Sequence, residues 1–286
     1  MLNMKPMIKY RGGKSKEIPF FEKYFPERFD TYYEPFLGGG AVYFHVAPQK
    51  AALNDINTGV MTFYREVKEK YSEVRQQLDS LQEQYEKNQL AYEYLKKDHP
   101  EERVENKNEA LYYLSRDMFN HKVESDYLES VLYFFINKTA YSGMIRYNAH
   151  GEYNVPFGRY KNFNTRKITD EHYNLLQGAN LYCGDYSVLF DMSTEDDFMF
   201  LDPPYDCIFN DYGNITFENG FDESEHRRLA DAYKQLKCKA LMVIGKTPLT
   251  EELYRNYIKD EYDKSYAVNI RNRFKSEAKH IIVMNY

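Results

Sequence analysis

Residues 198–205 read Phe198-Met199-Phe200-Leu201-Asp202-Pro203-Pro204-Tyr205, an apolar run that ends in an acid, two prolines and a tyrosine. A continuous apolar run is typical of a strand covered on both faces by helices. Two prolines continue neither a central strand nor a helix, so they predict a rigid turn at the strand's end. The turn offers a carboxylate, a main-chain carbonyl and an aromatic ring, which together suit a planar ligand with an exocyclic amino group. A plain turn capped by Asp202 is the alternative.

Other apolar runs in the chain have the same character, and most of them end in Gly or Asp. They are Thr31–Leu37, Ala51–Leu53, Asn180–Cys183, Ala240–Ile244 and His280–Met284. Amphipathic stretches such as Ser224–Leu236 lie between them, as expected for helices. This alternation predicts an α/β fold with an open sheet, whose ligands bind at the carboxyl ends of the strands.

The middle of the chain has a different pattern. Residues from Thr58 to about Asp126 are polar with helical periodicity, and Val131–Tyr160 is rich in Gly, Asn, Tyr and Pro, which favours turns and a hairpin. We therefore expect residues 1–57 and 175–286 to form the sheet domain, with residues 58–174 inserted into it.

The composition excludes several classes of protein. The chain has 286 residues, 43% hydrophobic and 29% charged, which is typical of a soluble globular protein. Its apolar runs are too short to cross a bilayer, and no secretory signal is visible. Three cysteines and seven histidines show neither a disulfide framework nor metal-ligand spacing. We expect a cytoplasmic protein with no membrane partner and no metal.

A glycine-rich segment follows the first apolar run. It reads Glu34-Pro35-Phe36-Leu37-Gly38-Gly39-Gly40, and Asp55 ends the next run about fifteen residues later. Glycines at a strand-to-helix junction let the main chain approach a ligand, and an acid after the next strand can accept ribose hydroxyls. The third glycine of the dinucleotide fingerprint is replaced by Tyr43, so S-adenosylmethionine fits this pattern better than NAD. A tight turn alone is the alternative.

A basic, glycine-rich turn lies near the N-terminus. Lys9-Tyr10-Arg11-Gly12-Gly13-Lys14-Ser15 is not a P-loop, because Ile8 stands at the position of its first glycine. The turn could still hold a carboxylate or a phosphate, although a surface turn is the more common outcome.

A local excess of positive charge covers the turn-rich segment and the few residues that follow it. Although the net charge is −6, Val131–Thr169 has six basic residues and one acid, Glu152. Aromatic and basic residues interleave there in a predicted hairpin, and a two-stranded ribbon fits the DNA major groove. A solvated loop, or a buried loop with packed tyrosines, is the alternative.

Taken in this order, the segments resemble a known family. Lys9–Lys14, Glu34–Phe44, Asp55, Asn148–Tyr160 and Asp202–Tyr205 are similar to the motifs of the DNA adenine methylases, the Dam-like N6-adenine methyltransferases. The resemblance implies a class I S-adenosylmethionine-dependent methyltransferase sheet in residues 1–57 and 175–286. It also implies a mostly helical target-recognition insertion with a β-hairpin in residues 58–174.

The resemblance implies a reaction and a set of residues. The protein is expected to transfer a methyl group from S-adenosylmethionine to N6 of a flipped-out adenine in duplex DNA, with GATC as the leading target. Catalytic roles fall to Asp202, Pro203, Pro204 and Tyr205. Cofactor contacts fall to Tyr10, Lys14, Glu34, Phe36, Gly38, Gly39, Gly40, Asp55, Asp185 and Asp202. DNA contacts fall to Lys9, Tyr141, Ser142, Met144, Arg146, Asn148, Pro156, Arg159 and Tyr160.

Two alternatives stay open on the sequence alone. One is an amino-group methyltransferase that acts on RNA or on a protein glutamine, and the other is a DNA-binding protein that has lost catalysis. The resemblance also leaves room for a cognate restriction endonuclease as a functional partner.

Overall fold

A computed structural model describes residues 4–143, 145–205, 221–264 and 278–286. Met144, a predicted DNA contact, lies outside the described residues. The chain divides into two compact units. The first, here the helical unit, comprises Met1–Gly13, Gly38–His45 and Asn57–Gln177. The second, here the sheet unit, comprises Lys14–Leu37, Val46–Ile56 and Gly178–Tyr286.

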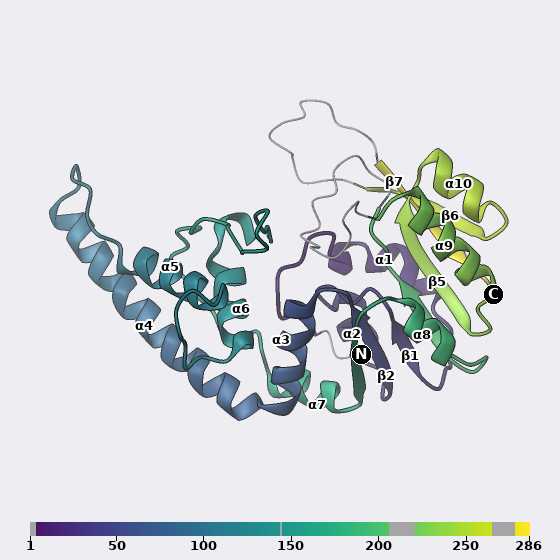
Figure 1. The fold of residues 1–286 in the computed structure, drawn as a ribbon, viewed down its shortest axis with the longest axis horizontal. Coiled ribbons are helices and arrows are strands. Elements are labelled where there is room, and N and C mark those ends of the chain that lie inside the picture. Colours follow the sequence, from purple (N-terminus) through teal and green to yellow (C-terminus); the bar gives the residue numbers. More distant parts are fainter. Residues whose placement is uncertain (1–3, 144, 206–220, 265–277) are drawn as a thin grey trace. The chain divides into compact units, whose positions relative to one another are not determined.

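The described part of the sheet unit contains a seven-stranded mixed sheet in the order β3-β2-β1-β4-β5-β7-β6 (Figure 1). The strands are β1 (Tyr32–Glu34), β2 (Ala51–Asp55), β3 (Ala179–Cys183), β4 (Phe198–Leu201), β5 (Lys239–Gly245), β6 (Ile258–Lys264) and β7 (Ala278–Met284). Strands β1 to β5 run parallel to one another, and β7 is antiparallel to both β5 and β6. The predicted α/β fold is confirmed, and each predicted apolar run overlaps a strand. The edge strand β6 was not predicted.

The strand order reverses between β1 and β4, which are paired to each other. In open α/β sheets the ligand crevice lies outside the carboxyl ends of the strands at such a reversal. Here those ends lead into Pro35-Phe36 after β1 and Asp202-Pro203 after β4. This edge of the sheet is therefore where the site is expected.

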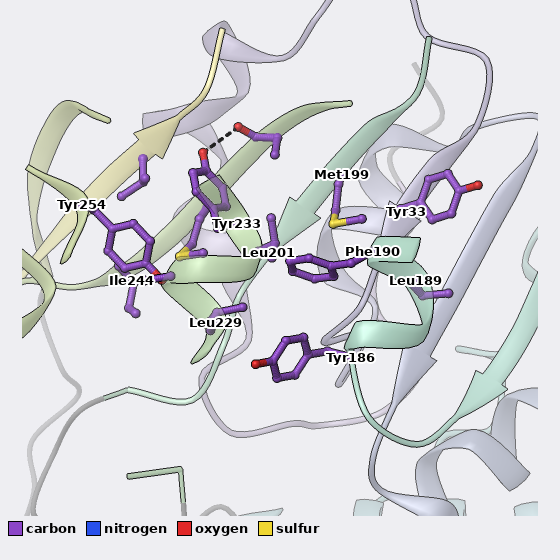
Figure 2. Close-up of a cluster of buried hydrophobic side chains, with 14 of the residues drawn as sticks. Tyr33, Tyr186, Leu189, Phe190, Met199, Leu201, Leu229, Tyr233, Ile244 and Tyr254 are labelled. Atoms are coloured by element: carbon purple, nitrogen blue, oxygen red, sulfur yellow. Dashed lines mark hydrogen bonds between the residues drawn. The ribbon is translucent and has the colours of Figure 1, made fainter. Parts of the chain in front are cut away.

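Side chains from helices cover both faces of β4, which explains its continuous apolar sequence. On one face, Met199 and Leu201 pack into a buried cluster with residues of α8 (Ser187–Met192), α9 (Glu223–Lys234) and α10 (Pro248–Tyr254) (Figure 2). Within that cluster the Tyr233 hydroxyl donates to the Ala240 carbonyl at 3.0 Å. On the other face, Phe200 stacks on Phe21 of α1 (Ile18–Phe21), with ring centroids 5.4 Å apart. Two short 3-10 turns, η1 (Lys14–Lys16) and η2 (Glu22–Tyr24), flank α1.

The helical unit is built around α6. Its elements are α2 (Ala41–Val46, with Val46 assigned to the sheet unit), α3 (Thr58–Glu69), α4 (Tyr71–Asp98), α5 (Lys107–Phe119), α6 (Glu129–Thr139), η3 (Tyr141–Gly143) and α7 (Asp170–Gln177). Residues Ser130–Thr139 of α6 are all buried, because α3, α4 and α5 pack around this helix. The long helix α4, blue in Figure 1, accounts for much of the polar stretch predicted to be helical. None of the helices in the described ranges is both long and apolar enough to span a bilayer.

Candidate active site and nucleic-acid interface

The turn after β4 brings three predicted residues together, and we call Lys14, Asp202 and Tyr205 the β4 corner. Lys14 Nζ lies 2.6 Å from Asp202 Oδ2 and donates to the Tyr205 hydroxyl at 2.6 Å. The Tyr205 hydroxyl also lies 3.4 Å from Asp202 Oδ1, so phenol, ammonium and carboxylate form a closed triangle. The Lys14 side chain is 2% exposed and that of Asp202 is 21% exposed. The corner is thus a mostly buried ion pair, and about a fifth of the Asp202 side chain is still exposed.

Burial governs the electrostatics of this corner. It raises the pKa of the Asp202 carboxyl above its ordinary value, and the positive charge of Lys14 works in the opposite direction. A carboxylate that is poorly solvated accepts hydrogen bonds more strongly than one in water. The arrangement therefore suits Asp202 as an acceptor for an incoming amino group.

The ends of β1, β2 and β3 form the rest of this edge. The buried amide of Asn54 donates to the Pro35 carbonyl and to the Gly184 carbonyl, both at 3.0 Å. The Asn54 side chain thereby joins the three segments that carry Phe36, Asp55 and Asp185. Glu34 is also buried, and accepts a hydrogen bond from the Tyr32 hydroxyl at 2.7 Å.

Asp185 is held by a residue that the sequence did not suggest. Arg228 of α9 contacts Asp185 Oδ1 at 3.2 Å and Oδ2 at 2.7 Å, and its guanidinium lies over the Tyr186 ring. Burial works to raise the pKa of Asp185, but hydrogen bonds from Arg228 and Ser187 lower it to about 2. No sequence pattern could reveal Arg228, because it reaches Asp185 from a helix far along the chain.

In the helical unit, the glycine segment packs against Tyr10. A Cβ added at Gly38 would lie 2.8 Å from Tyr10 Cδ1, and one at Gly39 would lie 3.0 Å from Tyr10 Cβ. At Gly40 a Cβ would approach Phe44 to 2.9 Å. Gly38 and Gly40 also have positive φ angles, of 49° and 67°. Gly38 and Gly40 are therefore required by both conformation and space, and Gly39 by space alone.

The expectation of turns and a hairpin over Val131–Tyr160 is wrong for Val131–Thr139, which belongs to the buried helix α6. The rest forms a hairpin, here defined as Ala140–Gly158 without Met144. Isolated antiparallel bridges join Ala140 to Phe157 and Tyr147 to Tyr153. The Asn148 side chain closes the turn: its Oδ1 accepts from the His150 and Glu152 amides at 2.9 and 3.0 Å. The hairpin is thus held mainly by its backbone and by one turn-closing amide.

The two faces of the hairpin differ. Tyr153, Val155 and Phe157 are buried, and the Tyr112 hydroxyl of α5 donates to the Val155 carbonyl at 2.8 Å. The predicted contacts Tyr141, Ser142, Arg146, Pro156 and Arg159 are exposed. The packed-tyrosine alternative therefore describes the inner face, and the outer face is available to a ligand.

The two exposed guanidiniums have different partners, a neutral side chain for Arg146 and a carboxylate for Arg159. Arg146 Nε donates to Asn154 Oδ1 at 2.8 Å, which braces the side chain across the hairpin. Arg159 lies 3.8 Å from Glu109 of α5.

Lys9 connects the N-terminal turn to α6 in the same unit. Its main chain exchanges two hydrogen bonds of 2.8 Å with the Asn137 side chain, and its Nζ lies 4.4 Å from the centre of the Tyr160 ring. Neither Lys9 nor Lys138 makes an ion pair in the described part of the chain. Burial, reinforced by the charges of Lys167 and Lys9, lowers the pKa of Lys138 to about 7. Lys9 Nζ donates to the Lys138 carbonyl at 3.3 Å, and the repulsion between these neighbouring positive charges favours an anion nearby.

The predicted residues therefore gather in two places. Within the sheet unit lie Lys14, Glu34, Phe36, Asp55, Asp185, Asp202, Pro203, Pro204 and Tyr205, and within the helical unit lie Lys9, Tyr10, Gly38, Gly39, Gly40, Tyr141, Ser142, Arg146, Asn148, Pro156, Arg159 and Tyr160. No cluster of three or more His, Cys, Asp or Glu side chains placed for a metal occurs among the residues that the structure describes.

Comparison with known proteins identifies the family. The model of the D12 class N6 adenine-specific DNA methyltransferases matches residues 10–270. The chain is 35% identical to the type II methyltransferase M.CviBI of Paramecium bursaria Chlorella virus NC1A, over 99% of this chain and 100% of that protein. It is 30% identical to the type II methyltransferase M.MjaIII of Methanocaldococcus jannaschii, over 100% of both chains. It is 26% identical to the DNA adenine methylase of Haemophilus influenzae, over 96% and 92% of the two chains. The chain belongs to the D12 class of N6 adenine-specific DNA methyltransferases.

Proposed function

We propose that this methyltransferase uses S-adenosylmethionine to methylate N6 of an adenine flipped out of duplex DNA, with GATC as its target. The observation that carries the chemistry is the β4 corner, which places a partly exposed carboxylate and an aromatic ring at the point where the strand order reverses. The amino group of a stacked adenine cannot reach a cofactor, and extruding the base costs roughly a few kcal/mol.

The corner's residues act by positioning. Asp202 and the Pro203 carbonyl accept the two amino hydrogens, and Tyr205 stacks on the base. Those hydrogen bonds draw the nitrogen lone pair out of conjugation with the ring and aim it at the methyl group. Such alignment and fixed dipoles lower the barrier without a covalent intermediate. Lys14 donates to both the Tyr205 hydroxyl and the Asp202 carboxylate and so holds them in fixed positions relative to each other.

The residues at the carboxyl edge fit S-adenosylmethionine, which supplies an electrophilic methyl group on a sulfonium. In the sheet unit, Asp55 suits the ribose hydroxyls, and Phe36, 5.2 Å from the Tyr186 ring, offers an aromatic wall beside Asp185. In the helical unit, Tyr10 and the glycines whose Cβ positions it blocks suit the methionine part. The carboxylates of Asp55 and Asp185 also suit S-adenosylmethionine because its sulfonium and its amino group are both positively charged.

Paired glycine substitutions test the cofactor assignment. Gly38→Ala places a methyl group against Tyr10, whereas Gly12→Ala has the same kind of positive φ, 78°, with nothing within 4 Å of the added Cβ. Both variants carry a backbone penalty of about 1–2 kcal/mol. Only Gly38→Ala displaces the Tyr10 ring, so calorimetry with S-adenosylmethionine should show roughly 3- to 10-fold weaker binding in that variant alone. Equal losses in both variants would contradict the assignment of Tyr10.

Target recognition is assigned to the outer face of the hairpin. Arg146 and Pro156 match members of the family that read GATC, and both are exposed on that face. Lys138, Lys161 and Lys167 are proposed to contact phosphates, together with Lys9. An anion would relieve the repulsion that Lys9 and Lys167 exert on Lys138. The type II methyltransferase names of two relatives support pairing with a restriction endonuclease that cuts the same sequence.

Asp202→Ala is the decisive test of the reaction. We expect it to abolish methylation while largely sparing DNA binding, measured as tritiated methyl incorporated into duplex DNA and as a gel-shift affinity. Asp30→Ala is the control, since it removes an exposed acid paired with Lys50 in the same unit. Near-normal turnover by Asp202→Ala would refute the role of the β4 corner. Sequencing that reports modified adenines in DNA from expressing cells would test GATC directly.

A further inference from the structure

A second cluster of charged side chains lies in the sheet unit, and we call Glu17, Tyr262, Lys264 and His280 the Glu17 cluster. Glu17 and His280 are buried, and His280 Nδ1 lies 2.7 Å from Glu17 Oε2. The same oxygen accepts from the Tyr262 hydroxyl at 2.8 Å, and Lys264 Nζ donates to the other carboxylate oxygen. The cluster joins the N-terminal segment to β6 and β7. The reaction proposed above uses none of its members.

The cluster is connected to the β4 corner through the backbone. The Glu17 amide donates to the Lys14 carbonyl at 2.7 Å, and this bond closes the η1 turn. Lys14 and Glu17 are therefore the two ends of one short, rigid turn. Fixing the Glu17 carboxylate on β6 and β7 fixes the direction in which Lys14 extends toward Asp202.

A second connection runs through aromatic rings. The His280 ring packs edge-on against the Tyr205 ring, with centroids 4.9 Å apart and planes at 64°. Gly245, which pairs with His280 across β5 and β7, has no side chain to displace the phenol ring: its Cβ position would be 3.8 Å from Tyr205 Cγ. The hydrogen bond to Glu17 sets the orientation of the imidazole, and the imidazole supports the phenol ring.

We propose that Glu17 and His280 are positioning residues for methyl transfer: Glu17 fixes the turn that presents Lys14 to Asp202, and His280 fixes the ring of Tyr205. The proposal rests on the function assigned to the β4 corner. It explains why a buried carboxylate has three donors placed on it. A carboxylate that only stabilised the fold would need no link to both Lys14 and Tyr205.

The charges of the Glu17 cluster and of the β4 corner are also coupled. Burial works to raise the pKa of Glu17, but hydrogen bonds from His280, Lys264 and Tyr262 and the charge of Lys14 lower it to about 2. Glu17 therefore stays ionised at working pH. The groups that face Asp202 are Lys14, Glu17, His280 and the Tyr205 hydroxyl, and the negative charge of Glu17 helps to raise the pKa of Asp202. Removing that charge should let Asp202 lose its proton at a lower pH.

The test compares Glu17→Gln with Glu261→Gln in the full-length enzyme. Glu261 is a matched control, because it lies on β6 and also binds two lysines, Lys246 and Lys279, but is exposed and belongs to neither cluster. Single-turnover methylation should be on the order of 10- to 100-fold slower in Glu17→Gln. The KM values for DNA and for S-adenosylmethionine should stay within about twofold, and the acid limb of the pH–rate profile should move to lower pH. Glu261→Gln should change none of these.

Two substitutions at His280 separate its two contacts and provide a second route if Glu17→Gln folds poorly. His280→Asn keeps a donor toward Glu17 but removes the ring beneath Tyr205, whereas His280→Phe keeps a ring and removes the donor. We expect both to slow single-turnover methylation, and the folded fraction of each variant is checked by thermal unfolding.

Three results would overturn the proposal. They are a single-turnover rate within twofold of the parent in folded Glu17→Gln, a rate loss shared equally by Glu261→Gln, or an acid limb that does not move. The failure of the proposed function looks different, because then Asp202→Ala itself remains active. An inactive Asp202→Ala together with a fully active Glu17→Gln would reject only the positioning roles.

Discussion

The β4 corner and the hairpin have opposite constructions. In the corner, side chains from separate segments meet in a mostly buried site, and each polar atom of Lys14, Asp202 and Tyr205 described above is fixed by another. In the hairpin, backbone bridges and the Asn148 turn hold the shape, and the side chains on the outer face are exposed. Tyr141, for example, is 52% exposed. The residues proposed to be catalytic therefore also contribute to the stability of the fold. The side chains proposed to read the bases lie on the surface and contribute little to it.

This contrast has an energetic consequence. Breaking a buried ion pair leaves an uncompensated charge, so changes in the corner should alter stability and activity together. Exposed side chains on the hairpin contribute little to folding, so changes there should alter recognition alone.

The largest effect is expected from Lys14→Met. It leaves the Asp202 carboxylate without its 2.6 Å partner, and we expect a loss of about 3–5 kcal/mol in the free energy of unfolding, measured with urea. Lys50→Met is the control, because the Lys50–Asp30 pair has a similar length of 2.8 Å but is exposed, and should change stability little.

A double variant sharpens this prediction. Lys14→Met with Asp202→Asn removes both charges and should recover most of the lost stability while remaining inactive. If the double variant is no more stable than Lys14→Met alone, the pair is not the cause of the loss.

An intermediate effect is expected from Arg146→Ala on the hairpin. If Arg146 contacts a guanine with both ends of its guanidinium, the variant should lose about 1–3 kcal/mol of binding to cognate DNA and accept other bases at one position. Its free energy of unfolding should change by about 0.5 kcal/mol or less. Lys161→Ala, which removes an exposed charge near Glu93, should instead weaken binding to all DNA sequences equally. Uniform weakening in Arg146→Ala would mark this residue as a phosphate contact.

The smallest effect is expected from Lys138→Met, and it depends on pH. The pKa of Lys138 falls from 10.5 to about 7 in the folded protein. Between these values the unfolded chain binds more protons, so the cost of burying Lys138 is complete below pH 7 and fades as the pH rises. Lys138→Met should therefore raise the melting temperature more at pH 6 than at pH 9. Lys87→Met, at an exposed position of α4 away from Lys138, should show no such difference between the two pH values.

The sequence predicted the sheet wherever burial was continuous. The runs in β1, β2 and β4 became strands that are buried at every position, as expected for strands covered on both faces. The run in β3 also became a strand, but at the edge of the sheet, where only Ala179 is buried. The strand β6 was missed because Ile258-Lys-Asp-Glu-Tyr-Asp-Lys264 is mostly charged, and only Tyr262 in it is buried. An edge strand of this kind gives no hydrophobic signal.

The sequence also marks the residues proposed to be catalytic more clearly than the residues proposed to position them. Asp202 and Tyr205 stand out because prolines mark a special turn, and Gly38–Gly40 because consecutive glycines are unusual. Glu17 and His280 have no such mark, since their pairing spans most of the chain and exists only after β6 and β7 have folded. Asn148 was predicted to touch DNA, and in the structure its side chain closes the hairpin turn.

The Asn54 amide joins the β1 and β3 ends to β2 with two hydrogen bonds. A displacement of any one of these ends is therefore transmitted to the others. Substitutions at Phe36, Asp55 and Asp185 should consequently be non-additive, with coupling of roughly 0.5–3 kcal/mol. Attempts to adapt the enzyme to donors bulkier than methyl would have to redesign these positions as a set, with Asn54 as the first residue to vary.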